Sequence, residues 1–244
     1  MVFSTSALVW EPGAERVVVI APHMDDETIG CGGAVAQHVK AGGRVHVVFL
    51  TDGRHQGSGK LAGLSAQARL DAENKLVETR KQEASRALEK LGVSSVAFLD
   101  VEDGTLGTDK HAAARLREVL EAQRPEVVYV PSYLEQHPDH FATSRVLLDA
   151  VRDSELKFQC MAYEVWTPLF PNCLIRIDDV VELKKSALSE YRSQLADQDY
   201  LHQALALNAY RSAGFADHYG RYAEAYFALP VDEYRRMFDD YTGG

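Results

Sequence analysis

Short runs of apolar, mostly β-branched residues alternate along the chain with longer stretches in which apolar residues recur every three or four positions. Residues 17–20 are continuously apolar, which is typical of a strand buried on both faces of a parallel sheet. Further strands are predicted at residues 45–50, 96–99 and 126–130, and helices at residues 32–40, 66–91 and 110–122. Because strands and helices alternate, the pattern predicts βαβ units joined by right-handed crossovers.

The last third of the chain departs from this alternation. Two further strands are predicted at residues 162–166 and 174–177, and helices at residues 180–195 and 197–210. No linker or internal repeat is visible, so one domain is expected over residues 1–244, with a divergent portion from about residue 178. The predicted fold is Rossmann-like: a doubly wound, mostly parallel α/β sheet of core order 3-2-1-4-5, with helices on both faces.

The composition is that of an ordinary globular protein, with 46% hydrophobic and 25% charged residues. The 26 Lys and Arg against 36 Asp and Glu give a net charge of −10, which argues against nucleic acid as a partner. Three cysteines without C-x-x-C spacing predict neither a disulfide framework nor a structural Cys₄ zinc site. Residues 1–10 lack the features of a signal peptide, and no apolar run is long enough for a membrane span. A cytoplasmic protein is therefore expected.

A first candidate site follows the strand at residues 17–20, where residues 22–27 read Pro-His-Met-Asp-Asp-Glu. His23 and Asp26 are three residues apart and converge on one ion if the chain turns helically there. Imidazole and carboxylate together suit Zn²⁺. The alternative is a helix N-terminus, where an acidic residue serves as a cap. That alternative explains one acid more easily than three in succession.

A second candidate site follows the strand at residues 126–130, where residues 137–140 read His-Pro-Asp-His. Proline suits the first position of a helix, which makes His137 the cap residue and places His140 in the first turn. The alternative is a surface helix start or a histidine satisfied within the core. The first motif strengthens the metal-site interpretation. The strands at residues 17–20 and 126–130 are expected to be neighbours at the switch point where such sheets bind ligands. The two motifs together predict a metal site.

Glycines at positions 30, 32 and 33 raise the competing prediction of a dinucleotide site. The G-x-G-x-x-G pattern requires a glycine at position 35, which is Val35. The acids at residues 25–27 would also repel a pyrophosphate. The glycines are better explained by close packing of the helix on the sheet.

At these positions the chain resembles the LmbE-like, or PIG-L-like, metal-dependent N-deacetylases. The family's first motif, A/P-H-x-D-D-E-x-x-G-x-G-G, matches residues 22–33, and its second, H-P-D-H, matches residues 137–140. The likeness extends over residues 15–195. Further matches are Thr51-Asp52-Gly53, Arg80, Glu83-Ala84, Lys184 or Lys185, Ala187 and Ser193-Gln194.

The resemblance implies that Zn²⁺ is held by His23, Asp26 and His140, with Fe²⁺ and Co²⁺ also suited to this donor set. It implies that Asp25 is the general base and His137 the second catalytic group. Three protein ligands leave an open position for water, which is the mark of a catalytic site. A carboxylate beside such a water completes its deprotonation, and the resulting nucleophile attacks an amide carbonyl.

Five further residues receive less definite roles. By similarity, Arg80 and Asp103 are expected to contact the substrate; the alternatives are a solvated charge and a plain turn. Asp139 either orients His23 or His140 through a hydrogen bond or caps the helix. Glu27 is expected to be structural or to support a metal ligand. His55 is expected to be an exposed loop residue, and the alternative is that it lines the mouth of the site.

The resemblance implies removal of the N-acetyl group from a small N-acetylglucosamine-type conjugate. Hydrolysis of another amide or ester is the alternative. A non-catalytic metal-binding or sugar-binding module is a third reading, but a binder would not need Asp25 and His137. Met24 stands where relatives often have proline, and Tyr133 lies further from the second motif than the tyrosine of some relatives. Substrate specificity is expected from residues 52–65 and 103–109, and a homo-oligomer is compatible with the sequence.

Overall fold

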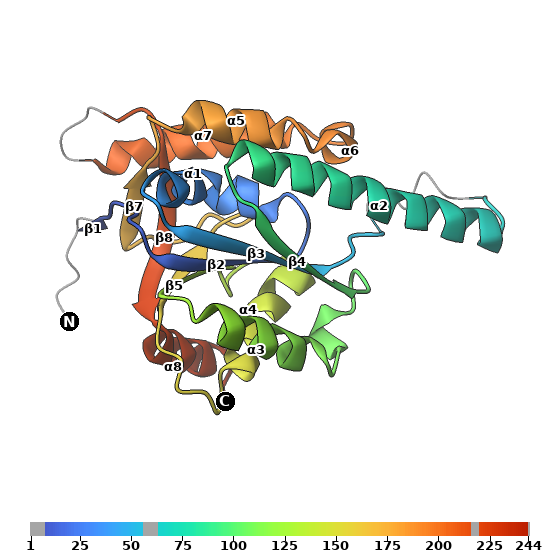
Figure 1. Cartoon of the computed structure of the whole chain (residues 1–244), viewed down its shortest axis with the longest axis horizontal. Coiled ribbons are helices and arrows are strands. Elements are labelled where there is room, and N and C mark those ends of the chain that lie inside the picture. The colour runs from blue at the N-terminus through green and yellow to red at the C-terminus, as the bar shows by residue number, and fades with distance from the viewer. Residues whose placement is uncertain (1–7, 56–62, 216–219, 244) are drawn as a thin grey trace.

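The computed structural model describes residues 8–55, 63–215 and 220–243, so part of the expected specificity loop, residues 56–62, lies outside the described ranges. Its centre is an eight-stranded sheet in the order β1-β7-β8-β6-β5-β2-β3-β4 (Figure 1). The strands are β1 (Leu8–Val9), β2 (Arg16–Ala21), β3 (Arg44–Thr51), β4 (Ser95–Val101), β5 (Val127–Pro131), β6 (Gln159–Tyr163), β7 (Cys173–Arg176) and β8 (Ala223–Pro230). Strands β4, β3, β2, β5 and β6 are parallel throughout.

Helices cover both faces of the sheet. In Figure 1, α1, α2, α5 and α7 lie above it, and α3, α4 and α8 lie below. The helices are α1 (Asp26–Lys40), α2 (Ala66–Lys90), α3 (Ala112–Gln123), α4 (Pro138–Ala150), α5 (Val181–Leu188), α6 (Arg192–Leu195), α7 (Tyr200–Arg211) and α8 (Val231–Thr242). None of the helices in the described ranges has the length and apolar character needed to cross a lipid bilayer.

Alternation along β2 explains why both faces are covered. Val17 and Val19 belong to one buried cluster with the α1 and α2 side chains, whereas Val18 and Ile20 belong to another with α3 and α4. Successive side chains of a strand point to opposite faces, so a continuously apolar strand requires cover on both sides. The predicted core order is confirmed, because predicted strands three, two, one, four and five correspond to β4, β3, β2, β5 and β6.

In the last third of the chain, β7 and α7 confirm the predicted strand at residues 174–177 and the predicted helix at residues 197–210, but other predictions were wrong. The strand expected at residues 162–166 is β6, three residues earlier, because residues 159–163 pair in parallel with β5. The helix expected at residues 180–195 is divided into α5 and α6. Strand β8 was not predicted at all; it runs antiparallel to both β6 and β7 and separates them.

Helix α1 begins six residues earlier than predicted, at Asp26, and is interrupted at Cys31, whose φ of −141° is not helical. Gly30 lies against the Tyr163 ring, where an added Cβ would come within 2.2 Å of that ring. This close approach confirms that the glycine allows the helix to pack tightly on the sheet. The break leaves the first turn of α1 as a separate unit at the end of β2.

A fully buried ion pair holds this broken helix. Glu224 of β8 accepts hydrogen bonds from the backbone amides of Gly33 and Ala34, 2.8 and 2.9 Å away, just beyond the break. Its carboxylate also lies 2.6 Å from the Nζ of Lys184, which donates to the carbonyl of Ile29 before the break. Both charges are inaccessible to solvent, so each depends on the other for compensation.

We expect Lys184→Met to lower the free energy of unfolding by about 3–5 kcal/mol, because it leaves the Glu224 carboxylate buried without its counter-ion. Urea unfolding followed by circular dichroism measures this change. Lys185→Met is the matched control, since Lys185 pairs with Glu182 at the surface and its replacement should change the free energy of unfolding far less. Equal losses in the two variants would contradict a structural role for the buried pair.

Candidate metal centre and active site

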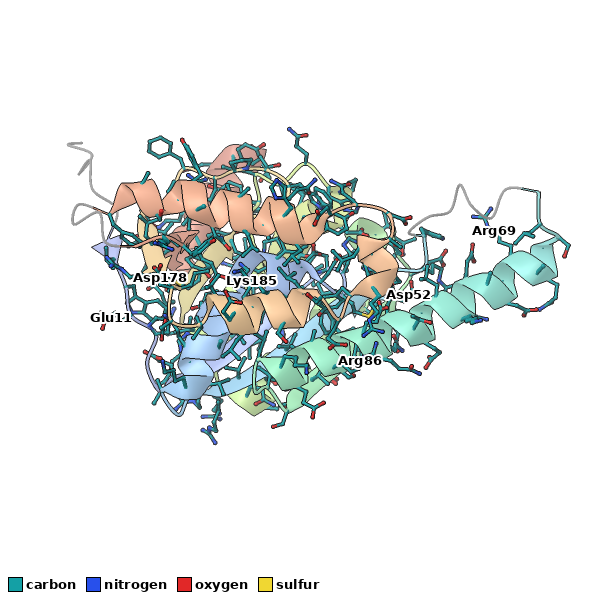
Figure 2. The ribbon with its side chains drawn as sticks, turned by 90° about the horizontal axis from the view of Figure 1, so that it is seen from above. Glu11, Asp52, Arg69, Arg86, Asp178 and Lys185 are labelled. Atoms are coloured by element: carbon teal, nitrogen blue, oxygen red, sulfur yellow. The ribbon has the colours of Figure 1, made fainter. Side chains whose placement is uncertain are left out.

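The predicted site residues gather at the carboxyl ends of the parallel strands. A cavity of about 380 Å³ opens there. It is lined by His23, Asp25, Asp26, His55, Arg80, Asp103, Gly104, His137, Pro138, Trp166 and Tyr200. Figure 2 shows Asp52, which follows β3, at this end of the molecule, and Glu11 and Asp178 at the opposite end. The two histidine motifs therefore meet in one crevice, as β2 and β5 are adjacent in the sheet.

Asp26 lies between two histidines. Its Oδ2 atom is 3.2 Å from the Nδ1 atom of His23 and 3.3 Å from the Nε2 atom of His140. Donor atoms bound tetrahedrally at about 2.0–2.1 Å from a zinc ion are separated by roughly 3.3–3.4 Å. The Asp26 carboxylate is therefore spaced from each of the two histidines as two ligands of one divalent metal are.

Further carboxylates lie behind the two histidines. The Nε2 atom of His23 is 3.1 Å from Asp103 Oδ1 and 3.4 Å from Asp139 Oδ2. The Nδ1 atom of His140 is 3.4 Å from Glu135 Oε2. Metal-bound histidines usually direct their second ring nitrogen at such a carboxylate, which orients the ring and raises its basicity. The same Oδ2 atom of Asp139 accepts a hydrogen bond of 2.8 Å from the Gly104 amide, and the residue that caps α4 is His137.

His140 provides the test of whether a cation fits. The ring is fully buried, and neither of its nitrogens makes a hydrogen bond within the described part of the chain. Burial would lower the pKa of His140, but the neighbouring Asp26 raises it to about 9. Burial would raise the pKa of Asp26, but His140 and His23 hold it well below its usual range. The cluster thus requires positive charge between Asp26 and the imidazoles, which a divalent cation supplies in place of protons.

One ring nitrogen of His137 also lies within 4.8 Å of those of His23 and His140. His137 caps α4, and its Nδ1 atom accepts a hydrogen bond of 3.2 Å from the backbone amide of Asp139. The hydrogen of a neutral ring is then on Nε2. Burial, together with His23 and His140, lowers the pKa of His137. His137 is therefore a neutral imidazole that lines the cavity and can donate a hydrogen bond from Nε2.

Asp25 has an unusual backbone and a perturbed carboxyl group. Its φ of +142° is rarely adopted by residues other than glycine, and such strain gathers at functional sites. Glu27 supports this conformation, because its carboxylate accepts a hydrogen bond of 3.1 Å from the Asp25 amide. Burial raises the pKa of Asp25 to about 8, and the neighbouring Asp26 carboxylate adds to the rise.

Glu27 itself is held by hydroxyl groups. Thr28 and Tyr191 both donate hydrogen bonds to its Oε1 atom, and the side chain is fully buried. Tyr191 follows α5 and comes from the divergent portion of the chain. Glu27 thus supports Asp25 through the backbone and does not reach the cavity.

Arg80 was expected either to bind substrate or to be a solvated charge, and the second alternative is wrong. The side chain is 3% exposed and lies on the cavity wall. It donates hydrogen bonds of 2.9 and 3.1 Å to the carbonyls of Gly53 and Met24, and its Nη2 atom is 3.7 Å from the Asp25 carboxylate. Arg80 thus joins the loops after β2 and β3 and places a positive charge beside Asp25.

Several residues at the site were not predicted. Glu135 lies 3.4 Å from the Nδ1 atom of His140, and Trp166 and Tyr200 line the cavity. His55, expected to be exposed, is half-buried and lines it too. Tyr133 packs against α8, with its ring 5.4 Å from that of Tyr234, and takes no part in the cavity.

Comparison with known proteins places the site in context. The family model PIG-L, described as GlcNAc-PI de-N-acetylase, matches residues 18–151. The chain is similar to a diacetylchitobiose deacetylase of Thermococcus kodakarensis, with 27% identity over 75% of this chain and 71% of that protein. It is also similar to a 1D-myo-inositol 2-acetamido-2-deoxy-α-D-glucopyranoside deacetylase of a Mycobacterium species, with 33% identity over 57% of this chain. The chain spans about half the length of that relative, 51%.

One relative has a different reaction in its name. A 4-oxalmesaconate hydratase of Pseudomonas putida is 34% identical over 47% of this chain and 42% of its own length. Among solved structures, the conserved protein TT1542 of Thermus thermophilus superposes with a TM-score of 0.71 and 27% identity, over 88% of this chain and 94% of that one. The chain is thus similar to proteins whose names indicate two reactions.

Proposed function

Because the chain belongs to the PIG-L family, we propose that it removes the N-acetyl group from a small N-acetylglucosamine-type conjugate by metal-dependent hydrolysis. The observation that carries the proposal is the position of the strained, buried Asp25 next to the His23, Asp26 and His140 donor set. A site that only bound a metal would need no further carboxylate facing the same cavity. The diacetylchitobiose and inositol-linked substrates in the names of the relatives support the substrate class.

In this proposal His23, Asp26 and His140 hold the metal, and Zn²⁺ suits them best, although Fe²⁺ and Co²⁺ suit the same donors. Such a cation polarises a carbonyl and lowers the pKa of a bound water towards about 7. Asp25 accepts the proton of the attacking water and returns it to the departing amine. Arg80 favours the ionised form of Asp25. His137 donates the hydrogen on Nε2 to the carbonyl oxygen as negative charge develops there.

Hydration of a carbon–carbon double bond is the second candidate, favoured by the similarity to the Pseudomonas putida hydratase. The same base would deprotonate water, but no amine would leave. The two functions are separated by one experiment on the purified, metal-analysed protein. We expect free amine from N-acetylglucosamine conjugates and no change in the ultraviolet absorbance of 4-oxalmesaconate. The opposite result would overturn the deacetylase proposal and favour the hydratase.

Glu135 provides a test of the metal site that does not depend on substrate. We expect Glu135→Gln to weaken metal affinity by about 10–100-fold, because a neutral amide polarises the His140 ring less than a carboxylate does. Competition with a chromogenic chelator measures the affinity.

Glu164→Gln is the matched control for Glu135→Gln. Glu164 is equally buried and follows the neighbouring strand β6, but it pairs with Arg211 and contacts no histidine in the described part of the chain. Its replacement should lower stability and leave metal affinity unchanged. If both variants bound the metal like the wild type, Glu135 would have no part in the metal site.

A further inference from the structure

Two aromatic side chains form one wall of the cavity, and we refer to Trp166 and Tyr200 as the aromatic wall. Trp166 lies in the loop after β6, and Tyr200 is the first residue of α7. Their ring centroids are 5.2 Å apart, and the ring planes meet at 76°. Both residues line the same cavity as Asp25 and His137. They lie outside residues 18–151, which the family model matches.

The aromatic wall has apolar surface in contact with solvent. Trp166 is 44% exposed although it lies beside a concave, polar site. Indole surface left in water is unfavourable, and an aromatic ring in a cavity that also holds polar groups is typical of ligand sites. The C–H face of a sugar or cyclitol ring is the apolar surface that matches such a ring in a sugar-processing site.

The position of Trp166 is fixed relative to the metal donors. The Oε1 atom of Glu135 accepts hydrogen bonds of 2.7–3.1 Å from the backbone amides of Val165, Trp166 and Thr167. The Oε2 atom of the same carboxylate faces the His140 ring. One buried side chain thus holds both a metal donor and the loop that carries the indole, so the aromatic wall is preorganised.

The charges of the cavity indicate that the stacked ring is neutral. Among the lining residues that the structure describes, Arg80 is the one lysine or arginine. Its guanidinium already donates to two carbonyls and faces Asp25. Arg54, nearby, is paired with Asp52 at 2.6 Å. With Asp25 and Asp103 on the same cavity, a phosphate would meet more negative than available positive charge.

On this basis, and resting on the proposed deacetylase function, we propose that Trp166 and Tyr200 form a subsite for the neutral ring attached to the N-acetylglucosamine unit. The ring is a pyranose or a cyclitol, and it stacks on the indole while the acetamido group faces Asp25 and His137. The aromatic wall therefore selects conjugates over free N-acetylglucosamine, and neutral conjugates over phosphorylated ones.

The chain has two tryptophans, which allows a direct binding test. Trp10 packs on His38, and neither residue lines the catalytic cavity, so Trp10→Phe leaves Trp166 as the single indole. Asp25→Asn is added to prevent turnover. Titration with N,N′-diacetylchitobiose, and separately with N-acetylglucosaminyl-inositol, is expected to change the Trp166 emission saturably. N-acetylglucosamine and its 1-phosphate should bind at least about tenfold more weakly. An unchanged emission at saturating concentrations of both neutral conjugates would overturn the proposal.

Kinetics of single variants provide the second test. In otherwise wild-type protein, Trp166→Ala should raise KM for the conjugate about tenfold while changing KM for free N-acetylglucosamine little, and Trp166→Phe should restore most of the loss. Phe170→Ala is the control, because Phe170 is on the same loop, 90% exposed and outside the cavity lining. Equal losses for the conjugate and free sugar in Trp166→Ala would overturn the subsite. The fluorescence test needs no turnover, so it can succeed even if the proposed function is wrong. Conjugate binding in that test, together with no amine release by the wild-type protein, would refute the proposed function and support the subsite.

Discussion

Asp25→Asn is expected to lower kcat for amine release by about 10²–10⁴-fold while the bound metal is retained. The amide is nearly the same size as the carboxylate, so it should fit the same pocket, but it cannot accept the proton of the attacking water. The metal should be retained because Asp26, and not Asp25, lies between the His23 and His140 rings. Steady-state assays of amine release and elemental analysis of the same preparation measure the two quantities.

Asp52→Asn is the matched control for this prediction. Asp52 is also a buried carboxylate at a strand end, and it pairs with Arg54 at 2.6 Å. It does not line the cavity, so its replacement should lower kcat by less than about tenfold. A fully active Asp25→Asn variant would show that another group takes the proton of the water. Loss of metal in that variant would instead make Asp25 a metal ligand.

The positions of the two histidine motifs could be predicted from the sequence because each follows directly from a local pattern. A buried strand, a short turn and a helix start place His23 and Asp26 three residues apart at the carboxyl end of β2. Proline after His137 marks a helix start at the end of β5 in the same way. Parallel strands have their carboxyl ends on one edge of the sheet, so adjacency of β2 and β5 is enough to bring the two motifs together.

The residues that support the donors could not be predicted in this way. Glu135 was distinguishable only by its proximity to the second motif, and its partners at residues 165–167 are thirty positions away. Tyr200 reaches the cavity because α7 packs against the sheet from the divergent part of the chain. Such contacts depend on tertiary packing, which hydrophobic periodicity does not encode.

Strand β8 and the break in α1 illustrate the same limit. Residues 223–230 pair with both β6 and β7, and Glu224 at 0% exposure is an acid in a strand interior, which sequence pattern alone disfavours. Its burial is explained by Lys184 and by the amides freed at Cys31. Neither the strand β8 nor the break in α1 is recognisable until α1, α5 and β8 are seen packed together.

His140→Ala is expected to abolish metal binding and reduce amine release to background. The variant removes one of the three proposed donors and the imidazole that lies between Asp26 and Glu135. We expect the variant to differ from the wild type in the response of its folding stability to Zn²⁺ as well as in its activity. A metal that binds the folded state alone stabilises it by about 2.7 kcal/mol at a hundred times its dissociation constant. Restoring Zn²⁺ to chelator-treated wild-type protein should therefore raise the free energy of unfolding by that amount, and His140→Ala should show no increase.

His38→Ala separates the loss of a metal donor from the loss of any buried histidine. His38 is as buried as His140, but its ring nitrogens lie 2.9 Å from the Gly13 carbonyl and 3.0 Å from the Tyr129 hydroxyl, away from the cavity. Its replacement should destabilise the fold while leaving the response to Zn²⁺ intact. If both variants responded to Zn²⁺ like the wild type, the cation would have to be held by the other cluster of potential donors, formed by His23, Asp103 and Asp139. The response to the metal, and not stability itself, therefore identifies the donor set.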